Sequence, residues 1–476
     1  MIERIRNKNG NILNGLNEFL SSKLFPFMTA TVSLLCYYLG LDIVFIYYVG
    51  ITGLVILLFC DDISPLITVL LFMCVLVSYE NSPSNLAENS PYYFQTEILV
   101  QIFIVIGLLG TAIIYRFIST CASGRFTVSP IFFGLCAFAA ALFINGIFSD
   151  GYSTKNLVYG LVMALCFLGI FTILKDNLST SPETFEKLAL SFFALSLVLV
   201  CELALKYLTC EELFVDGNLN REQLTFGWGM WNTMGMMLLI CLPSTLYLAG
   251  KYKRGFIFTV YSAFLFAAVW ASCSRQAMLG SAIIYPTGLI ILLIKGNNRK
   301  INIGIILCAL CVGVSLLFVF RDSVFRHIKE LILQLVANGE ITGSGRTSLW
   351  KGGFEYFKSS PVFGVGFYSD LYADYLGGFN GFSGMSFIPH MCHNTVIQLM
   401  SACGIVGLIT YLVHRVQTVI SFFRNVTYDR TFIALTMLSL IGLSLVDNHL
   451  FNIFPTIIYA CLTAVLCASG KREKTK

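Results

Sequence analysis

The chain has 476 residues, of which 57% are hydrophobic and only 12% are charged, and its mean hydropathy is +0.78. A soluble domain carries about 25% charged residues, so this composition excludes an ordinary soluble protein and indicates a protein of the lipid bilayer. The formal net charge of +5 does not indicate nucleic acid binding. The basic residues fall in short clusters between apolar runs, which is the pattern that orients membrane helices.

The first 24 residues combine a basic start, MIERIRNKNG, with apolar residues at helical spacing. No small-residue cleavage site clearly follows the first apolar run, so we interpret the segment as retained and not as a signal peptide. The spacing predicts an interfacial helix on the cytoplasmic leaflet, ahead of the first span.

Apolar runs recur through the rest of the chain, and one bilayer-spanning helix needs about 20 apolar residues. We therefore predict an all-α, polytopic transmembrane helical bundle of about fourteen spans. The expected spans cover residues 25–40, 43–60, 63–79, 97–118, 128–148, 156–174, 185–207, 229–249, 255–273, 276–295, 301–320, 394–413, 431–446 and 451–468. The predicted regions are a cytoplasmic segment (1–24), a first part of the bundle (25–320), an extracytoplasmic loop (321–393), the final spans (394–469) and a basic cytoplasmic tail (470–476).

The positions of the 31 Lys and Arg residues test the orientation of these spans. With the N-terminus in the cytoplasm, most of them fall on the cytoplasmic side, and the short outer loops and span ends keep only Lys155, Lys206, Arg221 and Arg275. Cytoplasmic loops carry an excess of Lys and Arg, so both termini are predicted to be cytoplasmic.

Residues 321–393 form the long hydrophilic segment, which this orientation places outside the cytoplasm. A loop of this length is expected to carry structure and function. Within it, RDSVFRHIKELILQLVANG (321–339) has apolar residues at helical spacing, which predicts an amphipathic helix along the membrane surface.

Arg275 lies between two apolar spans with almost no loop, in AVWASCSRQAMLGSA. A charge at this depth costs about 2.5 kcal/mol or more unless it reaches the interface or binds an anion. We interpret it as a functional residue, and an interfacial anchor is the alternative.

Arg346 follows a Gly-Ser-Gly turn and opens a short predicted helix that bears Trp350. Helix N-terminal NH groups and a guanidinium fork together favour a phosphate group. A solvated surface charge is the alternative interpretation of this arginine.

His390 and His393 occur where the chain re-enters the membrane, in SFIPHMCHNTVIQLM, with Asn394 as a predicted helix cap. Their spacing could bind a metal, but no acidic third ligand is evident and Pro389 disfavours a helix before it, so we predict no metal site. A neutral imidazole near the interface is better suited as a general base for a hydroxyl group.

Other polar residues on the outer side remain open alternatives. Asp447 and His449 lie between the last two predicted spans and could line a cavity or belong to a loop. Four acidic residues of the long loop are alternative bases that the sequence does not rank: Glu340, Glu355, Asp370 and Asp374.

The C-terminal half resembles the O-antigen ligase and polymerase superfamily of bacterial glycan-assembly membrane enzymes. The matching motifs are Ser274-Arg275 at the start of a span, GR-x3-W at Gly345, Arg346 and Trp350 followed by SPVFGVGF, and HN-x9-G-x2-G in HNTVIQLMSACGIVG. FGWGMWNTMGMMLLICLP is similar to a weaker segment of the family that contains asparagine, although Trp231 precedes Asn232 where many relatives have proline.

The resemblance implies an inner-membrane glycosyltransferase whose donor is a glycan on undecaprenyl diphosphate, with no metal and no cofactor. It implies that Arg275 and Arg346 hold the donor diphosphate and that His393 activates the acceptor hydroxyl; we add Asn232, His390 and Trp350 as substrate-binding candidates. The acceptor would be another lipid-linked repeat unit, for a polymerase of O-antigen, capsule or exopolysaccharide, or lipid A-core, for a ligase. A chain-length regulator and a flippase are candidate partners.

Two other classes of function compete with this interpretation. A transporter or flippase is expected to have charges in mid-span and an internal repeat, and neither is clear in this sequence. A structural scaffold of a polysaccharide export complex predicts that Arg275, Arg346 and His393 are dispensable.

Overall fold

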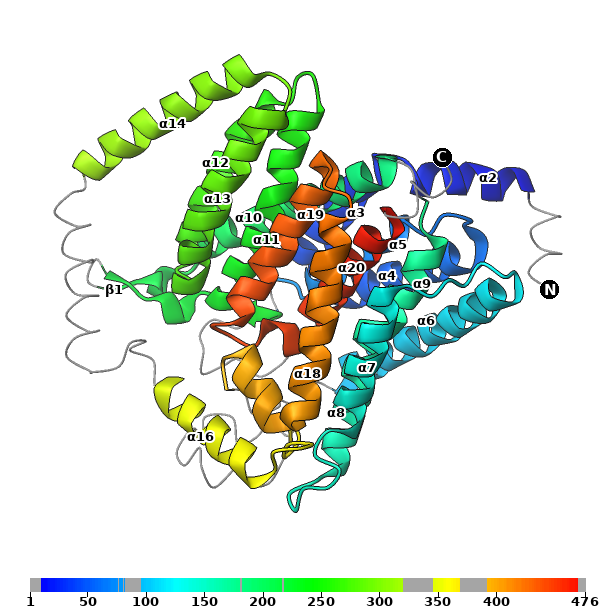
Figure 1. Cartoon of the computed structure of the whole chain (residues 1–476). Coiled ribbons are helices and arrows are strands. Elements are labelled where there is room, and N and C mark those ends of the chain that lie inside the picture. The colour runs from blue at the N-terminus through cyan, green and yellow to red at the C-terminus, as the bar shows by residue number, and fades with distance from the viewer. Residues whose placement is uncertain are drawn as a thin grey trace.

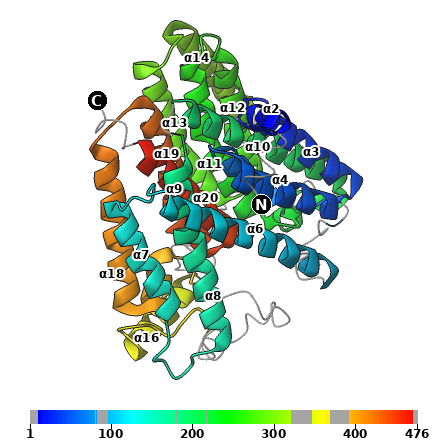
Figure 2. The same cartoon turned by 90° about the vertical axis from the view of Figure 1, so that its right-hand side faces the viewer.

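Apolar helices make up nearly all of the computed structural model, which describes residues 10–75, 77–79, 81, 96–179, 182–215, 218–319, 346–368 and 392–469. They pack into one bundle (Figure 2), with α14 set apart at one edge (Figure 1). The helix predicted over residues 321–339 and His390 lie outside the described residues. The predicted helical membrane bundle is confirmed in its main features.

The N-terminal half begins with α2 (Gly10–Leu20), α3 (Phe25–Leu39), α4 (Asp42–Phe59), α5 (Pro65–Phe72) with a 3-10 turn, and α6 (Thr96–Ala122). It continues with α7 (Pro130–Ile144), α8 (Thr154–Ala164), the π-helical turn η4 (Leu165–Gly169), α9 (Ile170–Asn177) and α10 (Pro182–Thr209). The C-terminal half contains α11 (Trp231–Lys251), α12 (Phe256–Ala271), α13 (Arg275–Lys295), α14 (Arg299–Val319), α16 (Arg346–Ser359), α18 (Thr395–Phe423), α19 (Tyr428–Ser444), the 3-10 turn η8 (His449–Phe451) and α20 (Ile453–Ser469).

Each predicted span overlaps a helix, but not every helix is long enough to cross a membrane. Seven helices among the described residues have the length and apolarity of a span, or eight if the pair Leu13–Leu20 and Phe25–Leu39, bent by 83°, counts as one. The 16 residues of α12 reach about 24 Å, whereas the apolar core of a bilayer is about 30 Å thick. The count of about fourteen spans therefore stays a prediction, as does the interfacial position of α2.

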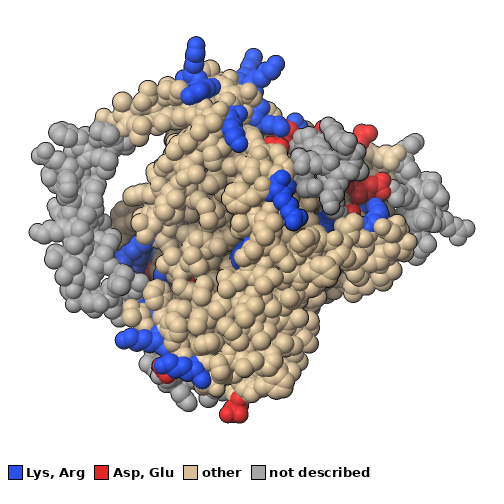
Figure 3. Space-filling model, in the orientation of Figure 1, with Lys and Arg blue, Asp and Glu red and all other residues tan. Residues whose placement is uncertain are grey.

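Several basic residues lie together at one end of the bundle. Lys251 ends α11, Lys295 ends α13 and Arg299 begins α14, so these basic residues share one end of the bundle. Figure 3 shows basic side chains at the top of the view and others at its left and lower left, with a broad uncharged surface between them. The starts of α11, α13 and α18 lie at the opposite end. The sides of the membrane, and with them the cytoplasmic position of both termini, stay a prediction.

Helix α11 runs through the centre of the bundle and contacts α10, α12, α13 and α19. Of the residues in its most apolar stretch, 94% are buried inside the protein. Small residues permit this close packing: a Cβ added at Gly235 would lie 2.6 Å from Cβ of Ser274 and 2.8 Å from Cβ of Ala277. The start of α11 is therefore held against the start of α13.

Residues 211–230, between α10 and α11, contain short strands that the all-α prediction did not include. The pairs β1 (Phe214–Val215) with β2 (Asn218–Leu219), and β3 (Thr225–Phe226) with β4 (Gly229–Met230), are antiparallel. The indole Nε1 of Trp228 donates a hydrogen bond to Glu202 of α10 at 3.0 Å. Strands of two residues have no periodicity that a sequence pattern could reveal.

Helix α18 is broken at Gly404, whose φ of 61° and ψ of −159° are not helical. Residues 360–366 cross it there: the NH of Val365 donates to Ser401 O at 2.8 Å, and the NH of Ile405 donates to Pro361 O at 2.8 Å. In a membrane, backbone groups freed by a helix break must find new partners inside the protein. The SPVFGVGF motif supplies those partners to the G-x2-G motif.

Replacing Gly404 with alanine is expected to destabilise the protein and to lower its activity with it. The position has a positive φ, and an added Cβ would lie 2.3 Å from Val362 O, so strain of about 2 kcal/mol or more is expected. The measurement is the thermal unfolding midpoint of the purified protein in detergent. The matched control is Gly442→Ala, because nothing lies within 4 Å of a Cβ added there; equal midpoints for the two variants would contradict the prediction.

Candidate functional site

The three residues singled out for chemistry lie at starts of helices. Arg275 is the first residue of α13, Arg346 is the first residue of α16, and His393 directly precedes Asn394, the N-cap of α18. These segments are far apart in the chain, and side-chain contacts with the loop between α19 and α20 bring them together.

His393 contacts Asp447, which lies in that loop. Nδ1 of the imidazole is 2.7 Å from Oδ1 of the carboxylate. The Asp447 side chain is 13% exposed and that of His393 is 39% exposed, so the carboxylate is the inner partner and the imidazole the outer one. A carboxylate bound to Nδ1 fixes the orientation of the ring and leaves Nε2 to exchange a proton with a ligand.

Asp447 is also held by neighbouring donors. The NH of Asn448 donates to Oδ1 at 2.9 Å, Nε2 of Gln276 donates to Oδ2 at 3.3 Å, and Nη2 of Arg346 lies 3.9 Å from Oδ2. Burial alone would raise the pKa of this carboxyl, but the hydrogen bond with His393 and the surrounding positive charges lower the pKa well below its ordinary value. Asp447 therefore carries its negative charge at neutral pH.

Gln276 joins the loop to the start of α13, where it follows Arg275. Its amide nitrogen is 3.0 Å from Nε2 of His449, and an amide NH₂ can only donate, so this ring nitrogen accepts. Burial lowers the pKa of His449, which favours the neutral imidazole that such acceptance requires. The hydrogen bond from Gln276 to Asp447 thus holds the residue next to Arg275 against the loop.

The start of α18 is fixed to the same loop. The Asn394 side chain caps the helix by accepting from Val396 and Ile397, and its amide donates to Leu445 O at 2.9 Å. The hydroxyl of Thr395 donates to Ser444 O at 2.6 Å. The His-Asn dipeptide of the sequence motif is therefore held at the place where α19 ends.

Two residues at the site have backbone conformations that L-residues rarely adopt. His393 has a φ of 49° and Cys273, two residues before Arg275, has a φ of 57°. Such conformations cost about 1–3 kcal/mol and cluster at functional sites. Asn298, at the other end of α13, also has a positive φ, but asparagine tolerates it.

Arg275 is exposed, and its neighbour Ser274 links two helix starts. The Ser274 hydroxyl accepts from the NH of Ala277 at 3.4 Å and donates to Oδ1 of Asn232 at 3.1 Å. Within the described ranges no carboxylate forms an ion pair with Arg275. A guanidinium in this setting is ready to bind an anion.

The remaining candidates lie as follows. Trp350 is half-buried on α16, and its Nε1 has no hydrogen-bond partner in the part of the chain that the structure describes. Glu355 pairs with Lys358 at 2.7 Å on the exposed side of α16, which removes it from the site. Glu340, Asp370 and Asp374 lie outside the described residues. Among the described residues, no group of three or more His, Cys, Asp or Glu could hold a metal ion.

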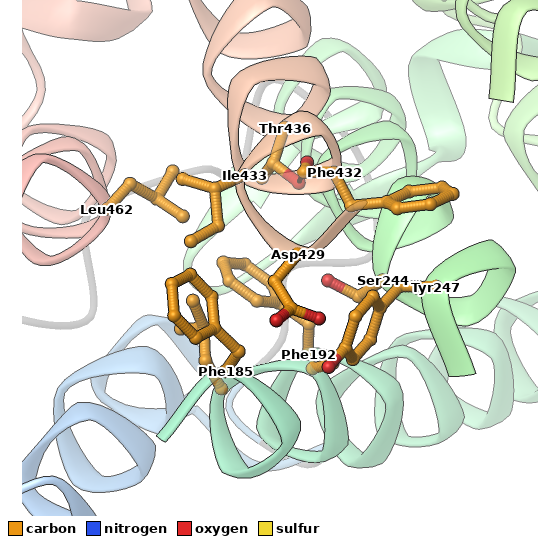
Figure 4. A pocket seen from close by; sticks show the side chains of 11 residues that line it. Phe185, Phe192, Ser244, Tyr247, Asp429, Phe432, Ile433, Thr436 and Leu462 are labelled. Atoms are coloured by element: carbon orange, nitrogen blue, oxygen red, sulfur yellow. Dashed lines mark hydrogen bonds between the residues drawn. The ribbon is translucent and has the colours of Figure 1, made fainter. Parts of the chain in front are cut away.

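A small cavity lies at the opposite ends of α11 and α19, lined by Phe192, Tyr247, Asp429 and mostly apolar neighbours (Figure 4). Asp429 is 3.9 Å from Lys251, at the basic end of the bundle. This cavity is therefore not part of the site.

Sequence reasoning left open the role of Asp447 and did not single out Gln276. Two signals in the sequence pointed to these residues. The loop SLVDNHLFN, which contains Asp447, was predicted on the same side as His393, and Gln276 directly follows Arg275. Neither signal could rank Asp447 above the acidic residues of the long loop.

Replacing Asp447 with asparagine is expected to lower kcat by about 10- to 100-fold, which corresponds to the loss of one charge-assisted hydrogen bond. Because the pKa of Asp447 is lowered in the folded protein, its contribution to stability is present above about pH 4 and is lost only as the pH falls through the lowered value. The measurement is the pH profile of kcat and KM. A profile and a kcat equal to those of the wild type would contradict a positioning role.

Comparison with known families adds an independent observation. Residues 260–412 match a family model described as O-antigen ligase. The match runs from α12 into α18 and includes Arg275, Arg346 and His393, whereas Asn232 and Asp447 lie outside it. No curated protein matches the chain.

Proposed function

We propose that this chain, a membrane protein of the O-antigen ligase and polymerase superfamily, transfers a glycan from undecaprenyl diphosphate to a hydroxyl group of an acceptor. The observation that carries the proposal is the contact of His393 with the buried carboxylate of Asp447. Asp447 also lies beside Arg346 and accepts a hydrogen bond from Gln276, the residue after Arg275. A base and two anion-binding groups are what a transfer from a lipid diphosphate requires.

In the proposed reaction, Nε2 of His393 takes the proton of the acceptor hydroxyl. The acceptor oxygen forms a bond to the anomeric carbon of the donor sugar, and the bond from that carbon to the phosphate oxygen breaks. The electron pair leaves with undecaprenyl diphosphate, and Arg275 and Arg346 stabilise the charge that develops on it. One displacement needs no enzyme nucleophile, so the configuration at the anomeric carbon inverts.

Neighbouring residues are proposed to orient the substrates. Asn232 positions Ser274, and thereby Arg275, through the hydrogen bond between their side chains. The unpaired indole NH of Trp350 is suited to donate to a sugar hydroxyl. His390, which lies outside the described residues, stays a substrate-binding candidate.

We place the protein in the bacterial inner membrane with the site on its extracytoplasmic side. The positive-inside pattern supports this orientation, because the site lies at the end of the helices opposite to Lys251 and Lys295. A lipid-linked glycan on the outer leaflet would then reach the arginines without leaving the interface.

The acceptor divides the proposal into two activities. The predicted span count of about fourteen favours a polymerase, in which the acceptor is another lipid-linked repeat unit of O-antigen, capsule or exopolysaccharide. The description of the matched family favours a ligase, in which lipid A-core is the acceptor. We propose the polymerase first and the ligase second, with a chain-length regulator and a flippase as partners.

The test is an assay of the purified protein with lipid-linked repeat units, without nucleotide sugar and with a metal chelator present. Lengthened lipid-linked products are expected from a polymerase, and glycan attached to added lipid A-core is expected from a ligase. Lengthening that persists undiminished in Arg275→Ala, Arg346→Ala and His393→Ala would overturn the mechanism.

A further inference from the structure

Arg221 lies in a well-anchored segment between α10 and α11. It begins the 3-10 turn η6 (Arg221–Gln223), which Asn220 caps by accepting a hydrogen bond from the NH of Glu222 at 3.2 Å. Nε2 of Gln223 donates to Glu212 at 3.0 Å. Together with the Trp228 anchor on α10, these contacts fix the backbone on both sides of Arg221.

The guanidinium of Arg221 faces the start of α11. Its carbon Cζ lies 5.4 Å from the ring centre of Trp231, a cation–π contact that restricts a long and flexible side chain. Trp231 precedes Asn232, which accepts the hydrogen bond from Ser274, and Arg275 follows Ser274. Arg221 thus contacts the start of α11, and Arg275 begins α13, whose N-cap Ser274 hydrogen-bonds to the start of α11.

Three guanidinium groups lie at this end of the bundle and are linked through their neighbours. Arg346 adjoins Asp447, which accepts from Gln276 beside Arg275, and Arg221 lies over the ring of Trp231. The positive charges of Arg221 and Arg346 both act on the guanidinium of Arg275. In the described part of the chain, neither Arg221 nor Arg275 forms an ion pair with a carboxylate. Like charges repel, so an anion of more than one charge would stabilise this arrangement.

The charges of Arg275, Arg346 and Asp447 together do not balance the double negative charge of the proposed donor. Asp447 lies 3.9 Å from Arg346 and offsets one of the two positive charges that Arg275 and Arg346 bring. A diphosphate that links a lipid to a sugar carries a double negative charge. Arg221 supplies the positive charge that would otherwise be missing.

We infer that Arg221 is a third anion-binding residue of the donor site and selects a lipid-linked diphosphate over a monophosphate. The inference rests on the proposed function, because the donor is taken from it. Arg221 lies outside the residues that match the family model, so this arm of the site belongs to the part of the chain that precedes the matched domain.

The test measures binding of undecaprenyl diphosphate, undecaprenyl monophosphate and inorganic pyrophosphate to the purified protein in nanodiscs. Arg221→Ala is expected to weaken binding of the lipid diphosphate by about 10- to 100-fold, the value of one charge-assisted contact, and to affect the monophosphate much less. Arg221→Lys should restore part of the affinity. Lys155→Ala is the matched control, because this exposed lysine of α8 lies on the same predicted side.

The outcomes separate this inference from the function on which it rests. Binding of the lipid diphosphate by Arg221→Ala with wild-type affinity overturns the inference, even where glycan transfer is intact. Selective loss of diphosphate binding by Arg221→Ala supports the inference. If the wild-type protein binds the lipid diphosphate but transfers no glycan, only the proposed function is overturned. If pyrophosphate competes fully and shows the same dependence on Arg221, the diphosphate group is the part recognised.

Discussion

His393→Ala is expected to lower the rate of glycan transfer by about 10²- to 10⁴-fold, the usual contribution of a general base. Nδ1 of His393 is engaged by Asp447, so Nε2 is the nitrogen that can accept the proton of the acceptor hydroxyl. The variant removes this base and leaves the arginines in place. The measurement is kcat and KM with saturating lipid-linked donor.

Binding of the donor provides the control for this variant. His393→Ala should bind undecaprenyl diphosphate with nearly wild-type affinity, because the base does not hold the diphosphate in the proposed mechanism. Lys351→Ala, which removes an exposed charge from α16, should leave both rate and affinity unchanged. A His393→Ala variant with a wild-type kcat would refute the assignment of the base.

Arg275→Ala is expected to lower kcat/KM by about 10²- to 10³-fold, as for the loss of one group that stabilises developing charge. Arg275 is exposed and has no ion-pair partner among the described residues, so its removal leaves no buried charge unpaired and the fold should persist. Arg275→Lys should recover only part of the activity, because an ammonium cannot grip two oxygens as a guanidinium does.

Arg346→Ala provides a matched comparison, because this arginine also adjoins Asp447. Its removal should lower kcat/KM by a similar factor and should additionally alter the pH profile, whereas Arg275→Ala should change the rate alone. The unfolding midpoint of each variant shows whether the fold is retained. Stable variants with wild-type kcat/KM would contradict an electrostatic role for these residues.

The common end of Arg275, Arg346 and His393 could be predicted, because alternating helices and the distribution of Lys and Arg fix which loops share a side. The partner of His393 could not. Asp447 is 54 residues away, and its choice over other acids depends on how α18 packs against the loop after α19. The helix break at Gly404 was equally hidden, because a glycine in an apolar run also serves ordinary close packing. The contact of Arg221 with Trp231 could not be predicted either, because the strands on both sides of Arg221 are too short to show a sequence pattern.

The enclosure of α11 has a consequence for how the protein is made. Among the seven helices of span length in the described residues, α11 is the least apolar, and 94% of its most apolar 18-residue stretch is buried. The corresponding stretch of α6 is among the most apolar and only 17% buried. A segment leaves the translocation channel for lipid according to its own apolarity, so α6 can enter the bilayer alone. Helix α11 is expected to remain at the channel until α12 and α13 are synthesised, which makes the assembly of the proposed donor site a late step of biogenesis.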